Sequence, residues 1–319
     1  MRTSNLVPST THQQHRSENR RQSTLLVLSL AAIVGVCGFA LAGPLGIFGS
    51  LVAIALVAFG NTRVAASAIL RLYDARALRP ENAPDLHKLF VALVQRARIA
   101  PLPRLYYVPS QTINAFAVGT GSQASVAVTD GLLRQLNPRE LAGVLAHELS
   151  HIRHNDLVVM GLADGLSRVT TILGQVGQLL VLLSIPAYFM GYEFPLFAAL
   201  VLFFALGASA LLQLALSRTR EYHADAGAAE ITGDPMGLAS ALARIEHSQG
   251  SWFERVFMPG RRDTQPALLR THPATGDRIN RLRELAGERP ASTLPAPERL
   301  TTSLGPPLRP RWHVLGLWY

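Results

Sequence analysis

The chain has 319 residues, of which 49% are hydrophobic and 16% are charged, and its mean hydropathy is +0.22. This composition excludes an ordinary soluble protein, and the length is too great for one small domain. The formal net charge is +9, but the sequence shows no basic helix or aromatic-interleaved patch of the kind that binds nucleic acid. Attraction of arginines to anionic lipid headgroups is the simpler interpretation. The single cysteine, Cys37, excludes an intramolecular disulfide, which fits a reducing compartment.

Four uncharged apolar segments predict four membrane-spanning helices, arranged as two hairpins. Thr24–Gly43, Val169–Met190 and Pro195–Leu216 each reach the ~20 residues needed to cross about 30 Å of hydrocarbon. Leu45–Phe59 is shorter. It is either a short span or the return arm of a hairpin that turns at Gly43-Pro44.

Arginines flank the outer ends of both hairpins, whereas the two hairpin tips carry no positive charge. These arginines are Arg2, Arg16, Arg20 and Arg21, then Arg63, Arg71, Arg76 and Arg79, and finally Arg218 and Arg220. The positive-inside rule therefore predicts that both termini and the segments between the hairpins are cytoplasmic. Alternatively, Arg20-Arg21, the first apolar stretch and Ala40-Leu41-Ala42 form a cleaved secretory signal. A retained anchor is favoured, because the stretch is longer than a usual signal core and a second apolar run follows at once.

Between the hairpins, the pattern predicts helices and short strands. We expect helices at Val64–Leu78 and Pro84–Ala97, the second with its apolar residues at helical spacing. Strands are predicted at Arg104–Val108, Ile113–Val118 and Ala124–Val128, the last two joined by the turn-rich connector Gly119–Ser122. They would form a small antiparallel sheet with one edge open to an extended peptide. Further helices are expected near Pro235–His247 and Thr275–Ala286.

The stretch His147–His151 has the spacing of half a metal site on a helix. Asn137–Glu140 predicts the start of that helix, with an N-cap, a proline at the first helical position and a glutamate three residues after the cap. At 100° per residue, His147 and His151 lie about 40° apart on one face. Glu148 lies beside them, where it can take a proton from an attacking water. The alternative is a chance match on a polar surface helix.

A third metal ligand is needed, and Glu221 and Asp225 lie four apart in a helical context. One carboxylate could bind metal while the other accepts an N–H from a ligating histidine. The alternative is an exposed helix whose carboxylates pair with Arg218 and Arg220. His223 lies about 200° around the helix from Glu221 and should face away.

With these motifs, the chain resembles HtpX-type membrane-bound zinc metalloproteases of the gluzincin group, relatives of the integral-membrane CAAX prenyl endopeptidases. The resemblance covers roughly residues 100–285 and rests on four motifs in order. These are Asn114–Ala117, Val144–His151, Ser217–Asp225, and Thr271–Pro273 followed by Arg278.

The resemblance implies a role for each motif. It implies one zinc ion held by His147, His151 and Glu221, with Glu148 as the general base and Asp225 as support for a ligand. It further implies that His272 stabilises the oxyanion of the tetrahedral intermediate. Asn114, Ala115 and Phe116 would belong to an edge strand that pairs with the substrate backbone.

We therefore expect a mainly α membrane protein with about four transmembrane helices and an α+β zincin-like catalytic domain containing a small antiparallel sheet. The expected divisions are a basic segment 1–23, a first hairpin 24–62, a first catalytic part 63–168, a second hairpin 169–216, a second catalytic part 217–287 and a flexible Pro-rich tail 288–319.

The expected function is zinc-dependent hydrolysis of peptide bonds in membrane or misfolded proteins, in membrane quality control. The partners would be polypeptide substrates and the lipid bilayer, with no nucleic acid, in a bacterial-type inner or plasma membrane. An alternative is a non-proteolytic scaffold or chaperone-like binder with a structural zinc. Such zinc usually has four protein ligands, and no fourth ligand is obvious apart from His154, for which local packing or hydrogen bonding with Asn155 and Asp156 is the favoured role. A transporter would need polar residues mid-membrane, where only Gln175 and Gln178 occur.

Overall fold

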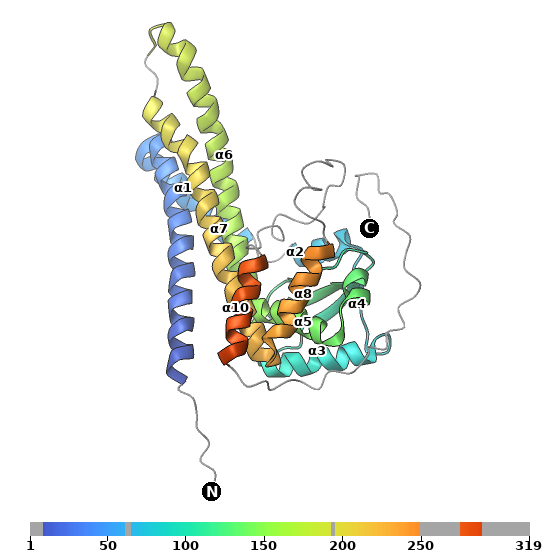
Figure 1. Ribbon diagram of the computed structural model, residues 1–319. Coiled ribbons are helices and arrows are strands. Elements are labelled where there is room, and N and C mark those ends of the chain that lie inside the picture. Colours follow the sequence, from blue (N-terminus) through green and yellow to red (C-terminus); the bar gives the residue numbers. More distant parts are fainter. Residues whose placement is uncertain (1–8, 61–64, 193–194, 249–274, 289–319) are drawn as a thin grey trace. The chain divides into compact units, whose positions relative to one another are not determined.

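The structure is a computed structural model, and it describes residues 9–60, 65–192, 195–248 and 275–288 (Figure 1). The chain divides into two compact units, and each unit combines two separate stretches of sequence. The first unit comprises Met1–Gly60 and Val159–Thr219, and the second comprises Asn61–Val158 and Arg220–Tyr319. Apart from residue 288, the predicted tail 288–319 lies outside the described residues.

The first unit begins with α1 (Ser9–Gly60), which reverses direction within its length. The backbone is non-helical at Ala42 and Gly43, and Gly43 has a φ of 56°, which favours glycine. Beyond this point the chain folds back, because the Ser50 hydroxyl donates to the Val34 carbonyl at 3.0 Å although 16 residues separate them. A Cβ on Gly46 would lie 1.8 Å from the Gly38 carbonyl oxygen. The predicted hairpin turn at Gly43-Pro44 coincides with this reversal.

The same unit contains most of α6 (Asp156–Phe189) and α7 (Leu196–Thr232). These helices pack closely, since a Cβ on Gly177 would meet the Leu202 Cβ at 2.5 Å. Among the described residues, three helices are long and apolar enough to cross a membrane, namely α1 over Arg21–Ala58, α6 and α7. The sequence predicts four spans, and the difference arises because α1 contains both arms of the first hairpin. Large apolar side chains are exposed along these helices, including Leu45, Phe48, Leu182, Phe189, Phe197 and Phe204.

The second unit contains a four-stranded sheet in the order β1-β2-β4-β3. The strands are β1 (Arg76–Ala77), β2 (Arg104–Val108), β3 (Ala115–Val118) and β4 (Ser125–Thr129). The prediction of an antiparallel sheet is wrong for one pair, because β2 and β4 run parallel. β3 pairs antiparallel with β4 and lies at the edge of the sheet, so the hairpin predicted around Gly119–Ser122 is present.

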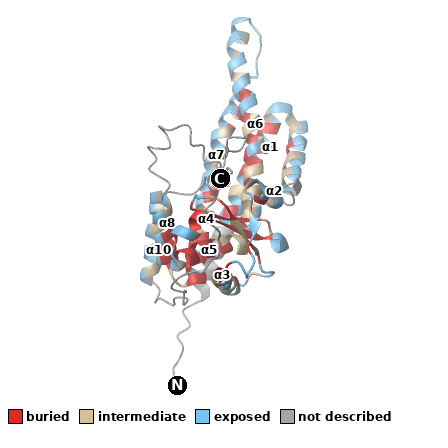
Figure 2. Ribbon diagram, turned by 90° about the vertical axis from the view of Figure 1, so that its right-hand side faces the viewer, coloured by how far each residue is buried: buried red, intermediate tan, exposed pale blue. Residues whose placement is uncertain are grey.

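Helices cover this sheet and supply most of the core. They are α2 (Ala65–Leu72), α3 (Pro84–Ala97), α4 (Asp130–Gln135), α5 (Pro138–Arg153), α8 (Pro235–Ser248), α10 (Thr275–Glu288) and the last part of α7. The predicted helix Val64–Leu78 is too long, because Arg76–Ala77 leaves it to pair with β2. Phe90 of α3 and Leu145 of α5 are fully buried in one apolar cluster. Figure 2 shows buried residues gathered around α5.

Helix α5 is held by local and tertiary contacts at its start. The Asn137 side chain accepts from the Glu140 backbone N–H, and the Glu140 carboxylate accepts from that of Asn137, which is the predicted capping box. A Cβ on Gly143 would lie 2.7 Å from the Leu238 backbone nitrogen, so glycine lets α8 approach α5 closely. These contacts fix the position of the helix that carries both histidines.

Candidate active site

Helix α5 places the two predicted histidine ligands side by side. The Nε2 atoms of His147 and His151 lie 3.2 Å apart, and the two rings meet edge to face with centroids 4.7 Å apart. His147 is buried and His151 is half-buried. The arrangement follows from their spacing of four residues, which stacks them on one face of the helix.

Glu221 of α7 completes a cluster of three metal-ligating groups. Its Oε2 lies 3.5 Å from Nε2 of His147, and its Oε1 lies 3.7 Å from Nε2 of His151. The three ligand atoms all lie within 4.8 Å of one another. Ligand atoms of a tetrahedral zinc with bonds of about 2.05 Å are separated by about 3.3 Å, so the donor set and its spacing fit this ion.

Small residues allow α7 to bring Glu221 to α5. Ala224 and Ala228 are fully buried on α7. A Cβ on Gly227 would lie 2.1 Å from the Ser150 hydroxyl oxygen of α5 and 3.0 Å from its Cβ. The backbones of the two helices therefore approach closely one to two turns beyond Glu221.

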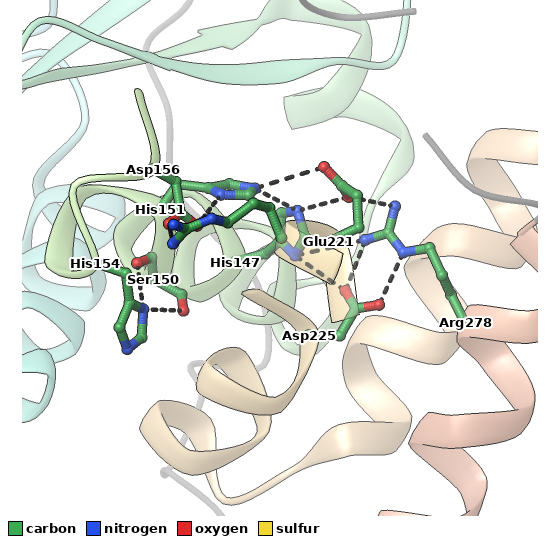
Figure 3. A network of polar contacts seen from close by, with 9 residues as sticks. His147, Ser150, His151, His154, Asp156, Glu221, Asp225 and Arg278 are labelled. Carbon is green, nitrogen blue, oxygen red and sulfur yellow. Dashed lines mark hydrogen bonds and ion pairs between the residues drawn. The ribbon is translucent and has the colours of Figure 1, made fainter. Parts of the chain in front are cut away.

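Both histidines are held from behind by buried aspartates (Figure 3). Nδ1 of His147 lies 3.0 Å from Oδ1 of Asp225, and Nδ1 of His151 lies 2.9 Å from Oδ2 of Asp156. Each Nδ1 can therefore donate to a carboxylate, which leaves each Nε2 free to bind a metal. The predicted supporting role thus fits Asp225, while sequence reasoning missed Asp156 at His151.

Each aspartate is paired in turn with an arginine. Arg278 of α10 donates to Asp225 from Nε at 2.8 Å and from Nη2 at 2.6 Å, and its Nη1 lies 3.0 Å from Oε2 of Glu221. Arg220 of α7 donates from Nη1 to Oδ1 of Asp156 at 2.5 Å. All of these charged side chains are buried.

The surroundings of His147 favour a positive charge. Burial of the imidazole acts to lower the pKa of His147, but its hydrogen bonds to Asp225 and Glu221 outweigh this and raise the pKa to about 10. The carboxylates of Asp225 and Glu221 that cause this shift also supply negative charge beside the proposed metal ligands.

The structure also bears on three sequence-based expectations about neighbouring residues. His154 contacts Ser150, with Nδ1 at 2.8 Å from the carbonyl oxygen, while the Asp156 carboxylate lies 2.9 Å from Nδ1 of His151. Arg278 pairs with both Glu221 and Asp225, and both carboxylates are buried, so the alternative of an exposed helix is wrong. His223 is not a member of the three-residue cluster, which agrees with its expected place on the far side of the helix from Glu221.

The other predicted site residues lie on α5, beside or within β3, or outside the described residues. Glu148 follows His147 on α5 and is half-buried. Asn114 directly precedes β3, Ala115 and Phe116 belong to it, and β3 packs against α5. His272 lies outside the described residues.

Two histidines and a glutamate around one point, with a second glutamate beside the first histidine, define a metallopeptidase class of site. Comparison with known proteins agrees, since residues 80–286 match peptidase family M48. The chain belongs to this family. It is similar to the "Protease HtpX homolog" of Acaryochloris marina, at 36% identity over 83% of this chain and 94% of that protein. It is also similar to the "Protease HtpX homolog" of Desulforapulum autotrophicum, at 33% identity over 83% of this chain and 89% of that protein.

A crystal structure of S. mikatae Ste24p also matches, with a TM-score of 0.46, 19% identity, and coverage of 84% of this chain and 66% of that chain. The family membership and the relatives over most of the chain establish a membrane-bound metalloprotease. The three long apolar helices agree with an integral membrane protein.

Proposed function

We propose that the chain is a zinc endopeptidase that cleaves membrane or misfolded proteins as part of membrane protein quality control. The observation that carries this proposal is the cluster of His147, His151 and Glu221 within 4.8 Å, on a helix that also carries Glu148. In zinc peptidases, two histidines and a glutamate commonly leave one position open for water or substrate.

The residues divide the chemistry of hydrolysis between them. When bound to His147, His151 and Glu221, zinc would polarise the scissile carbonyl and lower the pKa of a nearby water. Glu148 accepts a proton from the attacking water and passes it to the nitrogen of the leaving amine. Asp225 keeps the proton of His147 on Nδ1. The proposed donor to the oxyanion is His272.

The edge strand β3 would hold the substrate as an added strand. Asn114 and Thr129 form a hydrogen-bonded pair, with the Thr129 N–H donating to the Asn114 carbonyl at 3.1 Å. Bonded pairs alternate along an antiparallel ladder, so the backbone groups of Ala115 and Ala117 point away from β4. An extended peptide could pair with them beside the helix that carries Glu148.

The proposed topology is multi-pass, with both termini and the catalytic unit in the cytoplasm. The support is the distribution of arginines, which flank the outer ends of both hairpins, whereas the turns near Gly43 and Gly191 lack positive charge.

Metal content and proteolysis, measured together on purified full-length protein in detergent, test this function. The parent protein should contain one zinc per chain and cleave casein, and a chelator should abolish cleavage. Alanine at His147, His151 or Glu221 should remove the metal. Glu148→Gln should retain the metal and lower kcat by about 10²–10⁴-fold. Full zinc occupancy in the Glu221→Ala protein would show that the third ligand is wrong.

The same measurements separate this function from a scaffold with a structural zinc. A structural site usually has four protein ligands, whereas the cluster among the described residues has three. For a scaffold, Glu148→Gln would behave as the parent protein does, and neither protein would cleave casein.

A further inference from the structure

A buried ion pair lies behind His151, and neither of its members binds the proposed metal. Asp156 is the first residue of α6 and is 1% exposed, and Arg220 lies on α7 and is 9% exposed. Oδ1 of Asp156 accepts from Nη1 of Arg220 at 2.5 Å, while Oδ2 of Asp156 lies 2.9 Å from Nδ1 of His151. The two oxygens of one carboxylate therefore connect a histidine ligand to an arginine.

The contact with Asp156 decides which nitrogen of His151 can bind metal. A neutral imidazole carries one proton, and the nitrogen without it is the ligand. A carboxylate beside Nδ1 holds the proton there, fixes the ring orientation and makes Nε2 more basic. Nε2 of His151 is the nitrogen that faces His147 and Glu221.

Arg220 is needed because Asp156 is almost completely buried. A carboxylate without a partner is costly to bury, and it would protonate or turn toward water. The guanidinium compensates the charge and fixes the direction of the second oxygen. Asp225 and Arg278 form the same arrangement behind His147, so each histidine has an aspartate and an arginine of its own.

We propose that Asp156 and Arg220 are positioning residues for His151: Asp156 orients the imidazole, and Arg220 acts through Asp156. This inference rests on the proposed zinc site. It has a second consequence, because the pair also marks both ends of the segment 157–219. Residues that are 64 apart in sequence are joined close to where the chain leaves the second unit, after Val158, and re-enters it, at Arg220.

The first test compares metal affinity in matched aspartate variants of the full-length protein in detergent. Asp156→Ala should raise the Kd for zinc, measured against a chromophoric chelator, by about 10–100-fold. Asp156→Asn keeps an acceptor oxygen, so its zinc affinity should fall less than that of Asp156→Ala. The control is Asp130→Ala, because Asp130 is 4% exposed and pairs with Arg134 and Tyr107. Its zinc Kd should equal that of the parent.

Melting temperatures and cobalt spectra distinguish positioning from general damage. Asp130→Ala and Asp156→Ala should both lower the melting temperature, but only Asp156→Ala should change the visible absorption spectrum of the cobalt-loaded protein. An unchanged zinc Kd and cobalt spectrum in both Asp156 variants would overturn the proposal.

A double-mutant cycle tests whether Arg220 acts through Asp156. Arg220→Ala alone should weaken zinc binding, and the double variant Asp156→Ala/Arg220→Ala should bind zinc no more weakly than Asp156→Ala. If the fold-losses of zinc affinity in the two single variants multiply in the double variant, Arg220 acts independently of Asp156. His151→Ala and Glu221→Ala accompany these variants. If they too bind zinc like the parent protein, the proposed metal site itself is wrong. If they lose zinc while Asp156→Ala keeps it, only the positioning role fails.

Discussion

Arg278 and Asp225 form a buried two-point ion pair, with Nε to Oδ2 at 2.8 Å and Nη2 to Oδ1 at 2.6 Å. The same guanidinium also reaches Glu221 at 3.0 Å. One cation from α10 therefore stabilises a proposed metal ligand and the carboxylate that holds another ligand. Its planar fork suits two carboxylates in a way that a lysine ammonium does not.

Replacing Arg278 with alanine should therefore destabilise the protein and weaken metal binding. Removing one partner of a buried pair typically costs about 3–5 kcal/mol, because a buried charge loses its compensation. Arg278→Lys should recover part of this loss. The control is Arg281→Ala on the same helix, because the Arg281 guanidinium lies 3.8 Å from the centroid of the Tyr222 ring. Loss of this cation–π contact should lower the stability by only about 0.5–1 kcal/mol. Thermal unfolding in detergent measures the stability of each variant. Equal melting temperatures for the two alanine variants would contradict the role given to Arg278.

Glu140 should make stability depend on pH in the acidic range. Burial acts to raise the pKa of Glu140, but hydrogen bonds from Ser240, the Asn137 backbone and Arg244 lower it below its ordinary value of 4.5. The carboxylate therefore stabilises the fold above that value, and this contribution is lost as the pH falls through the folded pKa.

We expect Glu140→Gln to be less stable than the parent protein by about 2 kcal/mol at pH 7, because it loses hydrogen bonds to a charged group. The difference in melting temperature should shrink as the pH is lowered below about 4.5. Glu246→Gln, an exposed position on α8, serves as the control and should show no such trend. A difference that stays constant with pH would rule out this role of the Glu140 charge.

The edge of β3 can be tested with proline. Ala115→Pro should keep the metal and the fold but lose peptide cleavage, because it removes a backbone donor that points away from β4. Ala115→Ser should cleave at close to the parent rate. Phe116→Pro is the contrasting variant, since it would remove a donor within the ladder and should unfold the unit and release metal. Unchanged cleavage by Ala115→Pro would eliminate β3 as the substrate strand.

The topology can be tested with reporter fusions. A reporter after residue 80 or at the C-terminus should behave as cytoplasmic, and one placed near Gly191 should behave as exported. N-terminal sequencing is the companion measurement. A mature protein beginning at Gly43 would support the signal-peptide alternative, in place of a retained anchor.

The parts of the molecule that sequence reasoning described well are governed by local physics. The helix Pro84–Ala97 and the strand Arg104–Val108 have the predicted bounds, because a proline at the first helical position and apolar periodicity act over a few residues. The capping box at Asn137 is likewise contained in four residues. The position of His147 and His151 on one face of α5 follows from their spacing of four residues on a helix.

The parts that were missed depend on partners far along the chain. The parallel pairing of β2 with β4 is not visible in either strand, because each reads as an apolar run whatever the direction of its neighbour. Sequence proximity places Asp156 beside His154, whereas its carboxylate contacts His151 and an arginine 64 residues away. Arg278 belongs to the motif that begins at Thr271, but no local sequence pattern connects Arg278 with Asp225.

The division of the catalytic unit between two stretches of sequence sets an order of events during synthesis. A nascent chain that has reached Thr219 already holds His147, Glu148 and His151, but it lacks Glu221 and the arginine that pairs with it. The intervening segment Val159–Thr219, which holds most of α6 and the apolar first part of α7, emerges from the ribosome before the proposed third ligand does. With Glu221 as the third ligand, the enzyme would be unable to cut peptides while its own second apolar hairpin is being made, and it would become competent only after that hairpin is complete.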